Sequence, residues 1–138
     1  MNYWLAKTEP DVFSYSDLES LGKDDWGGVK NFAALKHMRS MKPGDRVFIY
    51  HTGKERSVVG VAEVIGEYYP DPKEDDLRWI TIDLKPLYPF NRPVTLKEVK
   101  SHPEFFSWEL VTQSRLSVMP VPTEIWKAIH QLGETKEV

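Results

Sequence analysis

The chain contains no cysteine among its 138 residues. Disulfides, thiolate zinc sites, iron–sulfur clusters and a cysteine nucleophile are therefore excluded. Long apolar runs are also missing: none approaches the ~18 residues of a membrane-spanning helix, and the first residues lack the basic start and apolar stretch of a signal peptide. We therefore expect a cytoplasmic protein without membrane contacts, associated with the nucleoid if its source is bacterial.

Sequence motifs of common enzyme classes are absent as well. The chain has no GxGxxG, GxxxxGK, HExxH or GxSxG pattern, and each absence weakens the case for a reaction class that requires that geometry. Glu63 and Glu67 share a strand face, but four residues of strand separate them by roughly 13 Å, beyond the ~5 to 9.5 Å of paired catalytic carboxylates. The histidines are not at metal-ligand spacing: His37, His51, His102 and His130. We therefore expect no catalytic residues, no metal site and no cofactor.

The charge of the chain is unevenly distributed. Eighteen basic against 21 acidic residues give a net charge of −3, whereas the segment 26–56 has seven basic and two acidic side chains and is therefore +5. One interpretation is a solvated helix face followed by a charged hairpin tip. The other is a phosphate-binding surface made by Lys30, Lys36, Arg39, Lys42, Lys54 and Arg56. If about four phosphates are neutralised, log K should fall with log salt at a slope of roughly −3 to −4.

Aromatic residues are abundant, with five Trp, six Tyr and six Phe. Small barrels use such residues to fill the core, and flat ligands use them as stacking platforms worth ~1 to 3 kcal/mol per base. We assign Trp4, Trp108 and Trp126 to the core. Trp26 and Trp79 are candidates for ligand contact, with packing as the alternative for each.

Local signals predict short strands and helices in alternation. Pro10 should end the first strand, because proline cannot donate to a strand ladder. Ser14 or Ser16 and, later, Asn31 are good N-caps for two helices, and Gly22 should follow the end of the first. The expected elements are a strand over 3–7, helices through 21 and over 31–41, strands from 46, over 57–69 and over 78–87, a helix over 95–100, a strand over 115–121 and a closing helix from 123, with a solvated acidic loop over 71–76.

This order of elements favours an α+β fold over a parallel βαβ sheet. Five strands interspersed with helices suit a small, partly closed β-barrel of about five strands flanked by short helices. The length and the even composition predict a single domain over residues 1–138.

Several ordered motifs mark the chain: Lys7-Thr8-Glu9-Pro10, Trp26-Gly27-Gly28-Val29-Lys30-Asn31, Met38 to Asp45, Val59 to Val64, Tyr69 to Pro72, Arg92 to Leu96 and Arg115-Leu116-Ser117-Val118. Together they resemble the EVE domain family, a branch of the PUA-like superfold, and the likeness covers nearly the whole chain. The resemblance implies a PUA-like fold. It also implies a protein that reads nucleic acid bearing a modified base, with cytosine derivatives such as 5-methylcytosine in DNA favoured.

Three positions depart from the family pattern. Thr8 replaces the usual Ser, Gly27 the usual Asp, and Lys30 the usual Arg. Lys30 keeps the charge but loses the planar fork that binds phosphate or a base edge bidentately. Gly27 removes a carboxylate acceptor, which puts in doubt a contact to an exocyclic amine at that place.

Within the implied function, the chain supplies candidates for a base-binding pocket. Trp26, with Tyr50 or Trp79, is expected to form an aromatic slot for a base extruded from its stack. Contacts to the base edge and at the rim are expected from Thr8, Glu9, Gly28, Val29, Asn31, His51, Arg115 and Ser117. The alternatives are local: Trp26 can plug the barrel end, Asn31 can serve only as a helix cap, and Arg115 can pair with Glu9.

Two other functions stay open. A PUA-like module can bind RNA, since nothing in the sequence detects a requirement for a 2′-hydroxyl. A hydrolase or transferase acting on nucleic acid or nucleotides would use Lys7, Glu9, Tyr50 or His51. Our expectation is binding without turnover by a monomer, with nucleic acid that carries a modified base as the partner.

Overall fold

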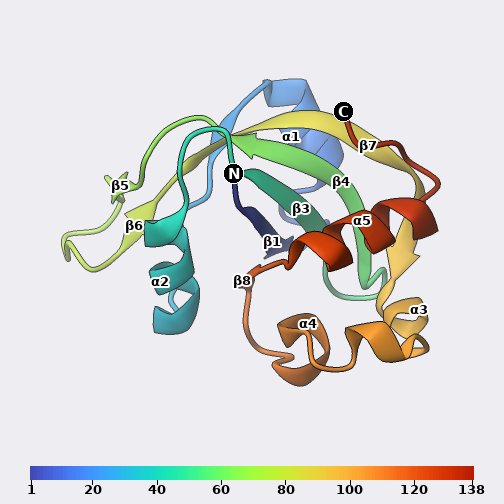
Figure 1. The fold of residues 1–138 in the computed structure, drawn as a ribbon. Coiled ribbons are helices and arrows are strands. Elements are labelled where there is room, and N and C mark those ends of the chain that lie inside the picture. The colour runs from blue at the N-terminus through green and yellow to red at the C-terminus, as the bar shows by residue number, and fades with distance from the viewer.

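The computed structural model describes residues 1–138, and its main feature is one curled six-stranded sheet in the order β2-β7-β4-β3-β1-β8 (Figure 1). The strands are β1 (Tyr3–Thr8), β2 (Asp24–Asp25), β3 (Arg46–His51), β4 (Ser57–Val64), β5 (Tyr69–Pro70), β6 (Ile80–Thr81), β7 (Asp83–Thr95) and β8 (Val118–Pro120). The helices are α1 (Tyr15–Leu21), α2 (Phe32–Ser40), α3 (Leu96–Lys100), α4 (Glu109–Thr112) and α5 (Thr123–Leu132), with a 3₁₀ turn at Pro103–Phe105. The expected α+β class and partly closed barrel are confirmed, with six strands in the sheet in place of about five.

The long strand β7 departs most from the sequence prediction. A strand was expected over 78–87, but the structure has the short β6, which pairs only with β5, and then β7 running on to Thr95. Two prolines of β7 pair with β4 next to register shifts, as Gly60↔Pro89 and Ala62↔Pro86. Such irregularities accommodate residues that cannot donate to the ladder, so β7 continues through these prolines and past Leu87, where the sequence prediction ended the strand.

The other two wrong strand boundaries have local causes. The strand predicted over 57–69 ends at Val64, and the segment that follows leads out to the β5–β6 ribbon. The strand predicted over 115–121 shrinks to β8, because a turn precedes it in which the Leu116 N–H donates to the Gln113 carbonyl at 3.1 Å.

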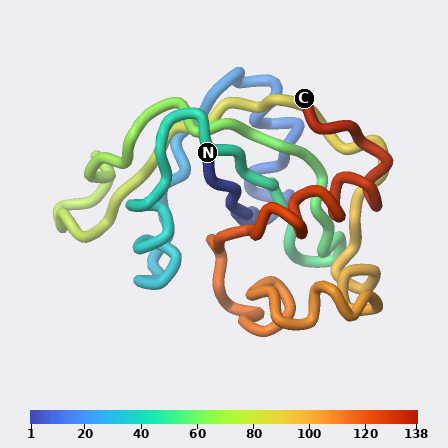
Figure 2. Tube along the Cα trace, viewed as in Figure 1, coloured from blue at the N-terminus to red at the C-terminus, as the bar shows by residue number.

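The helix α5 packs on a face of the sheet, whereas α2 lies to its side. α5 crosses one face of the sheet, where Trp126 stacks on Phe48 of β3 with ring centroids 3.9 Å apart (Figure 1). α2 and the β5–β6 ribbon lie together at the side of the molecule, on the left in Figure 2, and Phe32 stacks on Trp79 between them at 5.5 Å. None of the helices is long and apolar enough to cross a bilayer.

The core mixes aliphatic and aromatic side chains, and Trp4, Trp108 and Trp126 are buried in it as expected. One close approach explains a glycine in β4. A Cβ added at Gly60 would lie 2.7 Å from the Tyr15 ring, whose hydroxyl donates to the Val61 carbonyl at 2.7 Å. The bare backbone at this position therefore lets α1 pack directly on the sheet.

His130 of α5 lies in this core and is 3% exposed. Its Nδ1 lies 2.8 Å from the Trp126 carbonyl, which can only accept, so Nδ1 carries the proton. Nε2 is then the acceptor for the Tyr88 hydroxyl at 2.9 Å. Burial lowers the pKa of His130, so the ring is neutral in the folded protein.

This burial makes stability depend on pH. In the unfolded chain His130 has an ordinary pKa of about 6.5, so the unfolded state binds the proton at a higher pH than the folded state does. The free energy of unfolding, measured in urea from about pH 8 to about pH 5, should therefore fall below about pH 6.5, by up to about 1.4 kcal/mol per pH unit for this group. His130→Gln should flatten the slope, leaving the part due to His37, whose pKa burial also lowers. An unchanged slope in His130→Gln would contradict the assignment.

Candidate functional site

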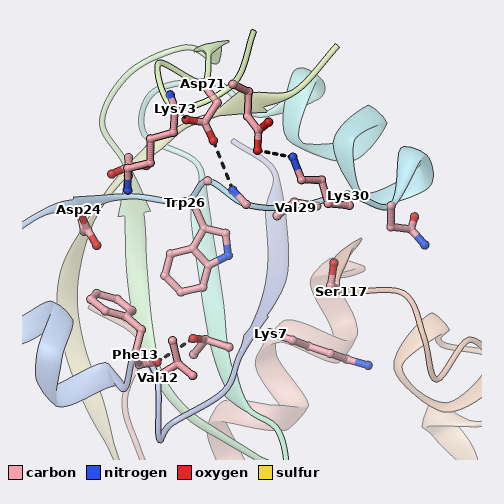
Figure 3. A pocket seen from close by; sticks show the side chains of 16 residues that line it. Lys7, Val12, Phe13, Asp24, Trp26, Val29, Lys30, Asp71, Lys73 and Ser117 are labelled. Atoms are coloured by element: carbon pink, nitrogen blue, oxygen red, sulfur yellow. Dashed lines mark hydrogen bonds and ion pairs between the residues drawn. The ribbon is translucent and has the colours of Figure 1, made fainter. Parts of the chain in front are cut away.

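A cavity of about 670 Å³ opens at one end of the sheet, beside the loop that leads from β2 into α2 (Figure 3). Its walls come from the end of β1, from the segment before α1, from the β2–α2 loop, from the chain after β5 and from the residue before β8. The lining residues are Lys7, Thr8, Val12, Phe13, Asp24, Asp25, Trp26, Gly27, Gly28, Val29, Lys30, Asn31, Asp71, Lys73, Glu74 and Ser117. Most of the expected base-binding motif residues are therefore together.

Trp26 forms the central wall of the cavity. Its backbone N–H donates to the Ile82 carbonyl at 2.8 Å, and its ring meets the edge of Phe13 with centroids 6.0 Å apart. The side chain is largely buried, but the indole N–H makes no hydrogen bond within the chain and is not sealed from solvent. In Figure 3 this nitrogen lies on the side of the ring that faces Ser117. Trp26 thus offers a ring and an unused donor to a ligand.

Two carboxylates occupy the space that a side chain at Gly27 would need. A Cβ there would lie 2.8 Å from Asp71 Oδ2 and 3.0 Å from Asp25 Oδ2. The Asp71 carboxylate also accepts from the backbone N–H groups of Lys73 at 3.0 Å and Gly28 at 3.4 Å. Gly27 therefore does not leave this wall without a carboxylate.

Asp24 adds a further carboxylate to the cavity wall that Asp25 and Asp71 form. Burial raises the pKa of Asp24, and the charge of Asp25 adds to the rise. Asp71 is 4% exposed, which corrects the prediction that residues 71–76 form a wholly solvated loop. The Thr81 hydroxyl donates to Asp25 at 3.2 Å and fixes that carboxylate in place.

The opposite wall is polar and built by the end of β1. The Thr8 hydroxyl donates to the Phe13 carbonyl at 2.7 Å, so its oxygen faces the cavity as an acceptor. The Lys7 backbone N–H donates to the Ser117 carbonyl at 2.9 Å, which ties β1 to the segment before β8. The Lys7 Nζ donates to the Ser114 carbonyl at 3.0 Å, and burial lowers the pKa of this amine.

Asn31 is the N-cap of α2, as the local interpretation held. Its Oδ1 accepts from the Ala34 N–H at 3.0 Å, while the side chain still lines the cavity. The side-chain amide hydrogens remain available, so capping and ligand contact are compatible. Lys30, next to it, pairs with Glu74 and lies 4.4 Å from the Trp79 ring centre.

Neither aromatic partner expected for Trp26 lines the cavity. Tyr50 faces a different cleft, and Trp79 belongs to the surface stack with Phe32. The sequence reading missed Phe13, which alone among the other aromatic residues touches Trp26. No periodic pattern marks it, because it belongs to the irregular segment between β1 and α1.

His51 is a structural residue and is not part of the pocket rim. Its Nε2 accepts from the Tyr15 N–H at 3.0 Å, so Nδ1 carries the proton and donates to Glu55 Oε1 at 2.8 Å. Tyr50 and His51 are consecutive residues of β3 and are both buried, next to a register shift after Ile49 in the β3–β4 pairing.

The remaining predicted residues lie outside the cavity. Glu9 and Arg115 form no ion pair with each other, and neither lines the cavity. On α2, the Arg39 guanidinium donates to the Arg78 carbonyl at 2.8 Å and Lys36 is exposed, and after the helix Lys42 faces Glu67 at 3.5 Å. Lys54 and Arg56 lie at the β3–β4 hairpin, apart from α2. No three His, Asp or Glu side chains are grouped as metal ligands.

Comparison with known proteins identifies the family. The model of the EVE domain matches residues 2–132. The chain belongs to the EVE domain family. Thymocyte nuclear protein 1 of Mus musculus is 32% identical to it, over 98% of this chain and 75% of that protein.

Solved structures of EVE-related proteins have the same fold as this chain. An NMR structure of a protein from Rhodopseudomonas palustris is 40% identical, covers 100% of this chain and 97% of that one, and has a TM-score of 0.93. A crystal structure of human THYN1 in complex with DNA containing 5-methylcytosine is 29% identical, covers 99% and 100% of the two chains, and has a TM-score of 0.89.

The assignment of His51 as a structural residue has a measurable consequence. His51→Ala should lower the free energy of unfolding by about 1 to 3 kcal/mol, because the buried Tyr15 N–H loses its acceptor. Glu55→Ala is the matched control: this side chain is largely exposed, so its loss should cost no more than about 1 kcal/mol. Urea denaturation of the two variants decides the point. Equal losses of unfolding free energy in the two variants would show that the stabilisation comes from the His51–Glu55 ion pair and not from the acceptor for the Tyr15 N–H.

Proposed function

We propose that this EVE domain binds DNA carrying a modified base, foremost a modified cytosine, and holds that base, flipped out of its stack, in the cavity beside Trp26. The observation that carries the proposal is the Trp26 indole, which presents a ring and an unpaired N–H in a cavity of about 670 Å³. That volume lies within the ~300 to 1,000 Å³ of small-ligand pockets. The complex of the human relative with DNA containing 5-methylcytosine supports the same ligand class.

The polar groups of the walls suit cytosine better than thymine. Cytosine carries an exocyclic amine that donates, whereas thymine has a carbonyl oxygen at the same position. The carboxylates of Asp25 and Asp71 can only accept when ionised, so they favour the amine and repel the carbonyl. The ring acceptors of cytosine then need donors, and the Trp26 N–H, the Ser117 hydroxyl and the Asn31 amide are available for them.

The arrangement favours binding over catalysis. The enzymatic alternative named Lys7, Glu9, Tyr50 or His51 as the reacting residue, and of these four only Lys7 lines the cavity. The Lys7 amine is bonded to the Ser114 carbonyl, and the two nitrogens of His51 are used within the fold. None of the four residues named for catalysis is therefore both unbonded and at the cavity, which favours a protein that holds the base by hydrogen bonds and stacking.

Fluorescence anisotropy with matched oligonucleotides tests the proposal. Single strands and duplexes carry cytosine, 5-methylcytosine, 5-hydroxymethylcytosine, thymine or methylated adenine at one position, with RNA versions as competitors. Wild-type protein should prefer the modified cytosines. Trp26→Ala should weaken that binding by about 5- to 150-fold, which corresponds to ~1 to 3 kcal/mol of stacking.

Two variants control for indirect effects. Trp79→Ala removes an aromatic ring outside the cavity and should leave the preference unchanged. Trp26→Phe keeps a ring and removes the indole N–H, so it separates stacking from hydrogen bonding. Thermal unfolding of each variant shows that it is folded. Equal binding to every oligonucleotide would refute the proposal, and stronger competition by RNA would transfer it to RNA.

A further inference from the structure

A second cleft, of about 320 Å³, lies on the other side of Lys7 from the Trp26 cavity. We call it the Lys7 cleft. Its lining residues are Lys7, Tyr50, Thr52, Gly53, Arg56, Leu96, Lys100, Leu110, Val111 and Ser114. Three of these side chains are cationic and none is acidic. Lys7 is the one cation that lines both the cavity and the cleft.

The fold brings the three cations together from separate parts of the chain. Lys7 of β1 pairs in register with Tyr50 of β3, and its Nζ lies 5.6 Å from the centre of that ring. The hairpin after β3 returns to β4 through Arg56, whose carbonyl accepts from the Leu96 N–H at 2.7 Å. This bond ties the hairpin to the start of α3, which carries Lys100. Strand pairing therefore fixes Lys7 and Tyr50, and the bond between Arg56 and Leu96 fixes the hairpin against α3.

The donors of the cleft are only partly used within the chain. The Arg56 Nε donates to the Gly53 carbonyl at 3.2 Å, which leaves the two terminal nitrogens free. Lys100 forms no ion pair. Tyr50 is 3% exposed, and its hydroxyl makes no hydrogen bond within the chain. Burial raises the pKa of Tyr50, so the phenol stays protonated and is a donor.

Three of the four cations between residues 30 and 42 already have partners within the chain. Lys30 is paired with Glu74, Lys42 faces Glu67, and Arg39 is bonded to the Arg78 carbonyl, while Lys36 is exposed. An anion that used the first three cations would have to displace these partners. Beside the Lys7 cleft, in contrast, the basic surface continues through Lys54 and Lys97, and its single acid, Glu55, is held by His51.

We propose that the Lys7 cleft binds a phosphate group of the same nucleic-acid strand whose base occupies the Trp26 cavity. The nucleic-acid strand then passes from the Trp26 cavity over Lys7 towards α3. A phosphodiester has two non-bridging oxygens, which suit the fork of Arg56 and the point charges of Lys7 and Lys100. The inference rests on the proposed function, because it assigns the phosphate to that strand.

The test uses Arg56→Gln, Lys100→Gln and the double variant, with Lys127→Gln as the matched control and Lys36→Gln as a test of the α2 surface. Lys127 is an exposed lysine of α5 that lines neither the cavity nor the cleft, so its loss removes the same charge away from both. Affinities for one oligonucleotide with and without 5-methylcytosine are measured by anisotropy over a range of salt concentrations. Each cleft variant should reduce the salt slope by about 1, and the double variant should weaken binding by roughly tenfold or more.

The preference for the modified base separates the two proposals. Phosphate contacts carry no sequence information, so the cleft variants should weaken binding to both oligonucleotides by the same factor. Absence of any preference in the wild-type protein is a failure of the proposed function. Unchanged affinity and slope in the double variant, or a loss confined to Lys36→Gln, would overturn the cleft proposal while the preference remained.

A second arm identifies the source of the phosphate. Inorganic phosphate is titrated into the wild-type protein, and the amide NMR signals of Arg56 and Lys100 are followed. Shifts there, together with the weakened oligonucleotide binding of the double variant, support the proposal. Shifts without any effect of the double variant on oligonucleotide affinity would assign the cleft to free phosphate and overturn it. Failure of the wild-type protein to bind any oligonucleotide would overturn both proposals.

Discussion

The parallel pairing of β1 with β3 is the constraint on which the cavity and the cleft both depend. The two strands run in register from Tyr3↔Arg46 to Thr8↔His51, and the Thr52 N–H extends the pairing by donating to the Thr8 carbonyl at 2.9 Å. Parallel neighbours cannot be joined by a tight turn, so the chain between them must cross over the sheet. That crossover contains α1, β2 and α2, and it carries Trp26 and Asn31 to the end of β1. The wall of the cavity is thus a consequence of the central strand pair.

The β1–β3 strand pair also lies between the acidic and the basic residues of the site. Lys7 lies at the boundary, with the acidic wall of Asp25 and Asp71 on one side and the cations Arg56 and Lys100 on the other. A nucleotide has a matching division, since its base is neutral and carries donors while its phosphate is an anion. The net charge of −3 is therefore no obstacle to a nucleic-acid partner, because the local fields and not their sum decide how a strand is oriented.

What the sequence predicted well depends on neighbours in the chain. Ser14 and Asn31 cap α1 and α2, and Gly22 ends α1 in a left-handed conformation with φ of 80°. Each of these roles follows from a side chain or a backbone preference acting within four residues. The cavity residues in the Trp26 to Asn31 motif were found because the family pattern places them together in sequence.

What the sequence did not predict depends on partners far along the chain. His51 was assigned to the pocket rim because nothing nearby reveals that Tyr15, 36 residues away, needs an acceptor. Asp71 was read as solvated for the same reason, since its acceptor role towards Gly28 spans 43 residues. Charge counting likewise assigned the phosphates to six basic residues of segment 26–56, but it could not show that Lys30 pairs with Glu74 and that Lys42 faces Glu67.

Gly27 shows why a departure from a family pattern has to be interpreted in three dimensions. Read along the chain, glycine in place of aspartate removes a carboxylate from the cavity. In the fold, the place of that side chain is taken by Asp71 Oδ2 and Asp25 Oδ2, which would lie 2.8 Å and 3.0 Å from an added Cβ. A third carboxylate there would meet two like charges in a partly buried wall, which costs free energy or forces protonation. The glycine therefore leaves the room that the two aspartates occupy, and the wall keeps carboxylates without a side chain at position 27.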